Sequence, residues 1–116
     1  MQADRFNKGK PKLSLLHLDA LTDTVRVLEF GAEKYSRNNW MKGLPYSEIL
    51  DSMLRHIAAL QRGELIDPES GLPHHGHIGC NAMFLEHSIK NCPQHDDLEL
   101  KYVIGVDPYE EEEQDF

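Results

Sequence analysis

The stretch GELIDPESGLPHHGHIGCN, residues 63–81, separates two predicted helices and carries the densest set of chemically active side chains in the chain. Gly63 is a typical helix-ending residue, and Pro68, Gly71 and Pro73 interrupt regular structure before the histidines begin. Within nineteen residues the stretch gathers three carboxylates, three histidines and an Asn. Carboxylates and imidazoles bind divalent metals and move protons near neutral pH, so the stretch predicts a functional loop between helices.

Apolar residues on both sides of this loop recur at helical spacing. The pattern predicts helices at about residues 18–35, 47–62 and 74–91, with Ser47 as the N-cap of the second and Pro93 ending the third. The expected core faces are Leu18, Leu21, Val25, Leu28 and Ala32 in the first helix, Leu50, Met53, Leu54, Ile57 and Leu60 in the second, and Ile78, Ala82, Leu85 and Ile89 in the third. The predicted fold is therefore all-α, a small bundle of three main helices. Oligomerisation is expected to complete it, because so small a unit buries little apolar surface.

Charge divides the chain into three predicted parts: a basic mobile arm at 1–11, a helical domain at 12–95 and an acidic tail at 96–116. Residues 1–95 hold eleven acidic and eleven basic side chains, whereas residues 96–116 hold nine acids against Lys101 alone. A neutral body argues against duplex nucleic acid as a partner. The absence of a long apolar run argues against a membrane location. Two cysteines without C-x-x-C spacing, and no signal peptide, favour a cytoplasmic protein.

His74, His77 and Asn81 stand at positions i, i+3 and i+7, so one helical face projects all three. His56 is expected to point between helices, and the loop would bring Asp67 and Glu69 to the same end. This set can hold a divalent cation or position a water molecule. Each member also has a structural interpretation: His56 as a hydrogen-bonded core histidine, Asp67 and Ser70 as turn and N-cap residues, and Glu29 and Glu33 as a solvated face.

A second cluster, KYSRNNW at residues 34–40, places two aromatic rings beside amide and basic side chains. Such a cluster can stack on a base, read its edge and hold phosphates. Tyr35 and Trp40 can equally be anchors that pin a loop to the core. The chain has neither the G-x-x-x-x-G-K-[ST] nor the G-x-G-x-x-G motif, which argues against the common nucleotide-binding folds.

Several segments, taken in order, resemble the bacteriophage dATP/dGTP diphosphohydrolase family, which is related to the all-α MazG-type nucleotide pyrophosphohydrolases. They are GKPK at 9–12, FGAEKY at 30–35, NWMKG at 39–43, LRH at 54–56, and GELIDPESGL at 63–72 followed by His74, His77 and Asn81. The resemblance covers about residues 7–90. It implies an all-helical dimer or tetramer that uses Mg²⁺ or Mn²⁺ to cleave a nucleoside triphosphate between its α and β phosphates.

One departure bears on the metal. MazG-type enzymes typically bind metal through a Glu-Glu-x-x-Glu helix and a later Glu-x-x-Asp helix, whereas this chain has Arg55-His56 and His74-x-x-His77 there. Imidazoles favour softer metals, so Zn²⁺ or Fe²⁺ are candidates as well. Three alternatives stay open: a different metal, carboxylates supplied by Glu33, Asp67 and Glu69, or a site that binds a nucleotide without hydrolysing it.

The leading hypothesis is thus a metal-dependent (d)NTP pyrophosphohydrolase acting on purine deoxynucleotides. The alternative is a non-catalytic protein that binds a nucleotide or cyclic nucleotide and so sequesters a signal of the host. The candidate catalytic residues are Glu33, His56, Asp67 and Glu69; the candidate metal ligands are Asp67, Glu69, His74 and His77; the candidate substrate-binding residues are Lys10, Lys34, Tyr35, Asn39, Trp40, Arg55 and Asn81.

The acidic tail ends on Phe116 and resembles the partner-docking tips of single-stranded-DNA-binding proteins. Its plainer interpretation is a solubilising disordered end. Just before it, residues 98–106 are rich in β-branched side chains, which predicts a short extended segment.

Overall fold

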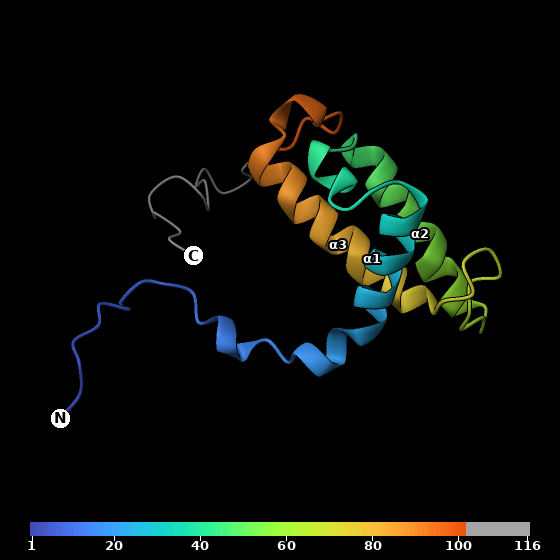
Figure 1. Ribbon diagram of the computed structural model, residues 1–116. Coiled ribbons are helices and arrows are strands. Elements are labelled where there is room, and N and C mark those ends of the chain that lie inside the picture. Colours follow the sequence, from blue (N-terminus) through green and yellow to red (C-terminus); the bar gives the residue numbers. More distant parts are fainter. Residues whose placement is uncertain (102–116) are drawn as a thin grey trace. The chain divides into compact units, whose positions relative to one another are not determined.

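The computed structural model describes residues 1–101. Its helices are α1 (Thr22–Lys34), α2 (Tyr46–Gln61) and α3 (His74–Asn91), shown in Figure 1. Short 3₁₀ turns accompany them: η1 (Leu13–Leu15), η2 (Leu18–Leu21), η3 (Asn39–Lys42) and η4 (Pro93–His95). Residues 1–101 contain no strand beyond an isolated bridge between Ile66 and Pro73. The predicted all-α class is confirmed.

The described residues fall into two units. Residues 18–99 form one compact unit, which holds all three α-helices, and residues 1–17 belong to the other. In residues 1–17 every side chain is exposed except that of Pro11, which is half-buried, and η1 is the regular element. The predicted division at residues 11 and 95 stays a prediction. Residues 98–101 form no strand, and the rest of the predicted extended segment and of the acidic tail lies outside the described residues.

The boundaries of α2 agree with the sequence pattern to within one residue, and α3 spans the predicted residues. Helix α1 begins four residues later than predicted, because Leu18–Leu21 form the 3₁₀ turn η2. The predicted N-cap of α2 is wrong, because Pro45 occupies that position and Ser47 lies inside the first turn. A carboxylate distant in sequence does the capping instead. The backbone N–H of Ser47 donates to Asp97 Oδ1 at 2.9 Å, and the Ser47 hydroxyl donates to the other carboxylate oxygen. Periodicity along one helix cannot reveal a cap supplied fifty residues later.

Helix α3 packs against both α1 and α2. Its contact with α1 depends on small residues. A Cβ at Gly76 would lie 2.6 Å from the backbone oxygen of Asp23, and a Cβ at Gly79 would overlap the Thr24 side chain. The Cys80 thiol, one residue further on, donates to the Thr24 carbonyl at 3.2 Å. Two glycines therefore allow α1 and α3 to approach closely.

Few apolar side chains are fully buried among the described residues: Val27, Tyr46, Ile49, Ala59, Cys80 and Cys92. The Tyr46 hydroxyl lies 2.9 Å from the Ser88 carbonyl oxygen and 3.2 Å from that of Cys92, so it ties the start of α2 to the end of α3. No helix within residues 1–101 is long and apolar enough to cross a membrane.

The predicted core faces are wrong in detail. None of their residues is fully buried, and several are exposed: Leu18, Leu21, Val25, Ala32, Leu54 and Ala82. The side of α2 that faces the interior instead carries Ser52, His56 and Ala59. Polar side chains occupy the space between the helices, so the apolar stripes are left partly at the surface of the single chain.

Candidate active site

A cleft of about 1250 Å³ runs between α1, α2, α3 and the two loops that join them. Eleven of the predicted site residues line it: Lys34, Tyr35, Asn39, Trp40, Arg55, His56, Asp67, Glu69, His74, His77 and Asn81. The two clusters recognised in the sequence thus share one cavity. Glu33 is exposed on α1 and does not line the cleft, and Lys10 belongs to the other unit.

Asp67 organises the loop before α3. Its backbone N–H donates to the Leu72 carbonyl at 2.9 Å, and its own carbonyl accepts the Gly71 N–H at 2.7 Å. Its carboxylate accepts the N–H groups of Glu69 and Ser70, each at 3.3 Å, and the Ser70 hydroxyl at 3.0 Å. Gly71 adopts a φ of 74°, the left-handed region that suits glycine. The interpretation of Asp67 and Ser70 as turn residues is confirmed, but the interpretation as N-cap residues is wrong, because Pro73 is the N-cap of α3.

The environment of Asp67 keeps it ionised. Burial would raise the pKa of this carboxyl, but the hydrogen bonds from Ser70 and the Glu69 N–H outweigh burial and hold the pKa below its usual value. The same carboxylate lies 3.5 Å from His77 Nε2. The turn therefore fixes a negative charge beside an imidazole in the cleft.

Three side chains form a hydrogen-bonded chain across the floor of the cleft. His74, only 3% exposed, places Nε2 2.8 Å from Glu64 Oε2 and Nδ1 2.8 Å from His56 Nδ1. Because Glu64 can only accept when ionised, His74 Nε2 carries a proton. If His74 is neutral, its Nδ1 accepts from His56 Nδ1–H, and His56 Nε2 is left with a lone pair. This is the arrangement of an oriented general base.

His77 stacks on this chain. Its ring lies parallel to that of His56, with centroids 4.3 Å apart and planes 4° apart. His77 Nε2 is 2.7 Å from the Ser70 hydroxyl oxygen, which accepts from it because the hydroxyl proton goes to Asp67. Burial and neighbouring imidazoles lower the pKa of His56, and burial lowers the pKa of His77 despite the attraction of Asp67. Both rings are therefore neutral at pH 7.

A preformed metal site is not present among the described residues, since no three His, Cys, Asp or Glu side chains converge on one point. Both ring nitrogens of His74 are engaged by Glu64 and His56, so His74 presents no lone pair to a metal ion. The carboxylates of Asp67 and Glu69 still line the cleft. Of the predicted metal ligands, His74 is therefore a hydrogen-bonding residue here, and Asp67 and Glu69 are the carboxylates that line the cleft.

The other half of the cleft is aromatic. Trp40 stacks on Phe84 with centroids 5.1 Å apart and meets the edge of His87 at 5.1 Å. The interpretation of Trp40 as an anchor is confirmed, and the same ring also lines the cleft. Tyr35 is 66% exposed, with Lys34 Nζ 5.4 Å from its ring centre.

Asn81 connects the two halves. Its amide nitrogen donates to the Ser52 hydroxyl at 3.1 Å and to the His77 carbonyl at 3.0 Å. Asn81 is largely buried, at 8% exposed, and lines the cleft. Its position near the middle of α3 supports the predicted face of His74, His77 and Asn81.

Sequence reasoning assigned no site role to several residues that line the cleft, among them Ser52, Arg62, Glu64 and Phe84. Helical spacing held a signal for two of them. Arg62 follows Arg55 by seven residues, and Phe84 follows Asn81 by three, so each shares a helix face with a recognised residue. Glu64 has no such signal, because its partner His74 is found only in the folded loop.

Two comparisons with known proteins identify relatives of this chain. The family model described as dATP/dGTP diphosphohydrolase, N-terminal, matches residues 1–98. A curated dATP/dGTP diphosphohydrolase of Salmonella phage PMBT28 is 36% identical over 97 residues, which cover 84% of this chain and 33% of the relative. The chain thus spans about a third of the length of that relative. No solved structure matches the chain described here. The chain therefore belongs to the dATP/dGTP diphosphohydrolase N-terminal family.

Proposed function

We propose that this chain hydrolyses purine deoxynucleoside triphosphates between the α and β phosphates, releasing a monophosphate and pyrophosphate. The observation that carries the proposal is the Glu64–His74–His56 chain, because it leaves a neutral imidazole nitrogen beside a large cleft. The name of the Salmonella phage relative supports a nucleotide substrate.

The chemistry begins at His56. Its Nε2 lone pair takes a proton from a water molecule, and the water oxygen attacks the α phosphorus. The bond from the α phosphorus to the bridging oxygen breaks, so pyrophosphate leaves with that oxygen. His56 becomes positively charged, and its hydrogen bond to His74 stabilises this charge. The Glu64 carboxylate stabilises the positively charged pair of imidazoles. Lys34, Arg37, Arg55 and Arg62 line the cleft and can offset the negative charge of the phosphates.

A divalent cation is expected to enter with the triphosphate. Mg²⁺ is usually bound through one or two carboxylates together with substrate phosphates, rather than by a complete protein cage. We assign this role to Asp67 and Glu69, whose carboxylates line the cleft. When bound, the cation would polarise the phosphate oxygens.

We expect the active species to be a homo-oligomer. Six fully buried apolar residues make a small core for the described part of the chain, and Leu54 on α2 stays 60% exposed. A second copy that covered this face would bury the apolar stripes of α2. Light scattering coupled to gel filtration measures the mass, and a monomer at micromolar concentration would refute the expectation.

A panel assay tests the proposed activity. Each of the common NTPs and dNTPs is incubated with the protein and Mg²⁺ or Mn²⁺, and the products are separated by chromatography. Monophosphate and pyrophosphate from a purine deoxynucleotide, abolished by EDTA, would support the proposal. If each nucleotide is recovered intact but remains bound to the protein, the chain is a sequestering protein instead.

A further inference from the structure

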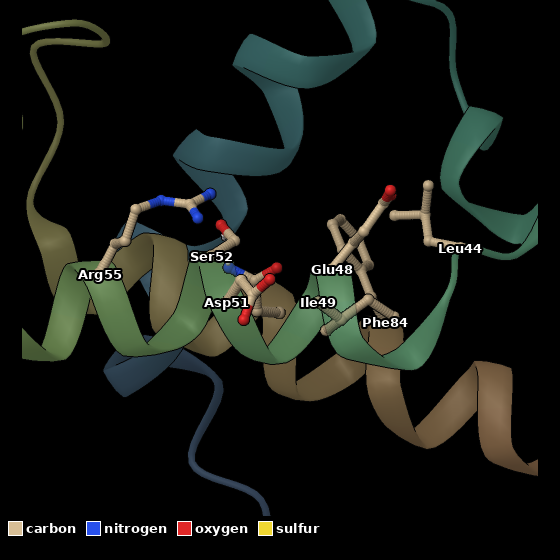
Figure 2. A pocket seen from close by; sticks show the side chains of 8 residues that line it. Leu44, Glu48, Ile49, Asp51, Ser52, Arg55 and Phe84 are labelled. Atoms are coloured by element: carbon tan, nitrogen blue, oxygen red, sulfur yellow. Dashed lines mark hydrogen bonds between the residues drawn. The ribbon is translucent and has the colours of Figure 1, made fainter. Parts of the chain in front are cut away.

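A smaller pocket opens on α2 beside the main cleft. It has a volume of about 350 Å³ and shares Leu44, Ser52, Arg55, Asn81 and Phe84 with the cleft. Glu48 lines this pocket but not the cleft. Figure 2 shows the side chains of Glu48 and Arg55 extending to the same side of α2, with Ser52 between them and the Phe84 ring beside Glu48. Asp51 also lines this pocket. The pocket therefore has apolar and aromatic walls and two carboxylates, and Glu48 is the one on the same side of α2 as Arg55.

The Glu48 side chain is exposed, and its carboxylate has no protein partner among the described residues. Glu48 is the third residue of α2, the position from which a glutamate normally returns a hydrogen bond to the N-cap N–H. Here the N-cap is Pro45, which has no N–H, and the N–H of Ser47 is already taken by Asp97. Within residues 1–101 the Glu48 side chain makes no hydrogen bond or ion pair. Its charge suits the helix dipole, but that effect does not require it to line a pocket.

The residues that line the cleft and the pocket follow one another along α2, and this sequence of positions sets the direction in which a nucleotide would lie. His56, Arg62 and Glu64 lie toward the C-terminal end of the helix, and Glu48 lies in its first turn. Glu48 and Arg55 are seven residues apart, about 10 Å along the helix axis. Phosphates at the His56 end therefore place the base at the pocket, next to Phe84 and Leu44.

We propose that this pocket holds the purine base and that Glu48 selects guanine. The proposal rests on the proposed function, which puts a nucleotide in the cleft. Guanine presents N1–H and the 2-amino group side by side, and a carboxylate can accept both. Adenine presents the N1 lone pair at the same place, which a carboxylate repels. The pocket thus binds guanine nucleotides in preference to adenine nucleotides.

Calorimetry with nucleoside monophosphates tests the selection without hydrolysis. The parent protein should bind dGMP about 10- to 100-fold more tightly than dAMP, the range of a good bidentate contact. The analogue dIMP lacks the 2-amino group and should fall between them. Glu48→Gln should abolish the preference for dGMP, whereas Glu86→Gln, an exposed glutamate on α3 outside both cavities, should keep it.

Three results would overturn the inference: equal binding of dGMP and dAMP by the parent, no binding of either, or a preference that survives Glu48→Gln and is lost in Asp51→Asn. Failure of the base selection can be distinguished from failure of the proposed hydrolysis. Selective binding that depends on Glu48, in a protein that hydrolyses nothing, would refute the proposed hydrolysis and keep the base selection. Hydrolysis of dGTP and dATP at equal rates, with equal binding of dGMP and dAMP, would keep the proposed hydrolysis and refute the base selection.

Discussion

The Nδ1 atoms of His56 and His74 lie 2.8 Å apart, so one imidazole donates a hydrogen bond to the other. Two nitrogens that both carried protons would repel, and two that both lacked them would repel as well. The contact therefore fixes the tautomer of His56 through its neighbour. Because Glu64 determines where His74 keeps its proton, the free nitrogen of His56 depends on a carboxylate that it does not touch.

Glu64→Gln tests this dependence. The amide can still accept from His74 but no longer stabilises a positive charge on the pair of imidazoles. We expect kcat to fall about 10- to 100-fold with KM little changed, since general-base catalysis as a whole contributes about 10²–10⁴-fold. The acidic limb of the kcat profile should also move to lower pH. An unchanged profile and rate, equal to those of the Glu86→Gln control, would show that Glu64 has no part in catalysis.

Stability should depend on pH through the half-buried histidines His56 and His77. The pKa values of His56 and His77 lie below the ordinary value of 6.5, so the unfolded chain binds more protons than the folded chain just below that pH. Their contribution to the free energy of unfolding is complete above pH 6.5 and is lost as the pH falls toward the folded pKa values. Thermal unfolding between about pH 7.5 and 5.5 measures this loss. His56→Asn should show a smaller fall in Tm than the parent; a fall of parental size would contradict the assignment.

Gly76→Ala should destabilise the contact between α1 and α3. The new methyl group would meet the backbone oxygen of Asp23, which cannot move aside as a side chain can. Overpacking costs about 1–3 kcal/mol and the better helix propensity of alanine offsets up to about 1, so we expect a net loss of about 1–2 kcal/mol. Urea denaturation measures the change.

Gly31→Ala is the matched control. Gly31 lies inside α1 and a Cβ there would meet nothing within 4 Å. The substitution should stabilise the protein by about 0.5–1 kcal/mol, because glycine loses more backbone entropy on folding. Equal effects of the two substitutions would show that α1 and α3 do not pack as described.

Trp40 should report nucleotide binding directly. It is the single tryptophan of the chain, it stacks on Phe84, and it lines the cleft. A base stacked beside it would change the environment of the indole, so titration with dGMP should change its fluorescence in a saturable way. If calorimetry detects dGMP binding while the emission stays constant, the base does not approach Trp40.

Local features of the sequence predicted the helices and the polar face of α3. The boundaries of α3 and the common face of His74, His77 and Asn81 follow from glycine, proline and helical spacing alone. The core faces did not follow, because the rule that apolar stripes face inward assumes an apolar interior. Here Ser52, His56 and Asn81 occupy that interior and form hydrogen bonds across it.

The roles inside the site were harder to predict than its location. A histidine spaced for metal binding, His74, uses both nitrogens for Glu64 and His56. Sequence spacing shows which side chains share a face, but not which lone pairs are already taken in the fold. The capping of α2 by Asp97 is unpredictable for the same reason, since both contacts are made between distant segments.

The most direct test of the central claim is single-turnover hydrolysis of dGTP by the parent and by His56→Asn, with His75→Asn as control. His75 lies on the same helix as His74 but pairs with Asp23 at the surface, 2.7 Å away. The account predicts dGMP and pyrophosphate from the parent and the control, and a rate at least about 100-fold lower from His56→Asn. Parental rates from His56→Asn would contradict the assignment of His56 as the general base.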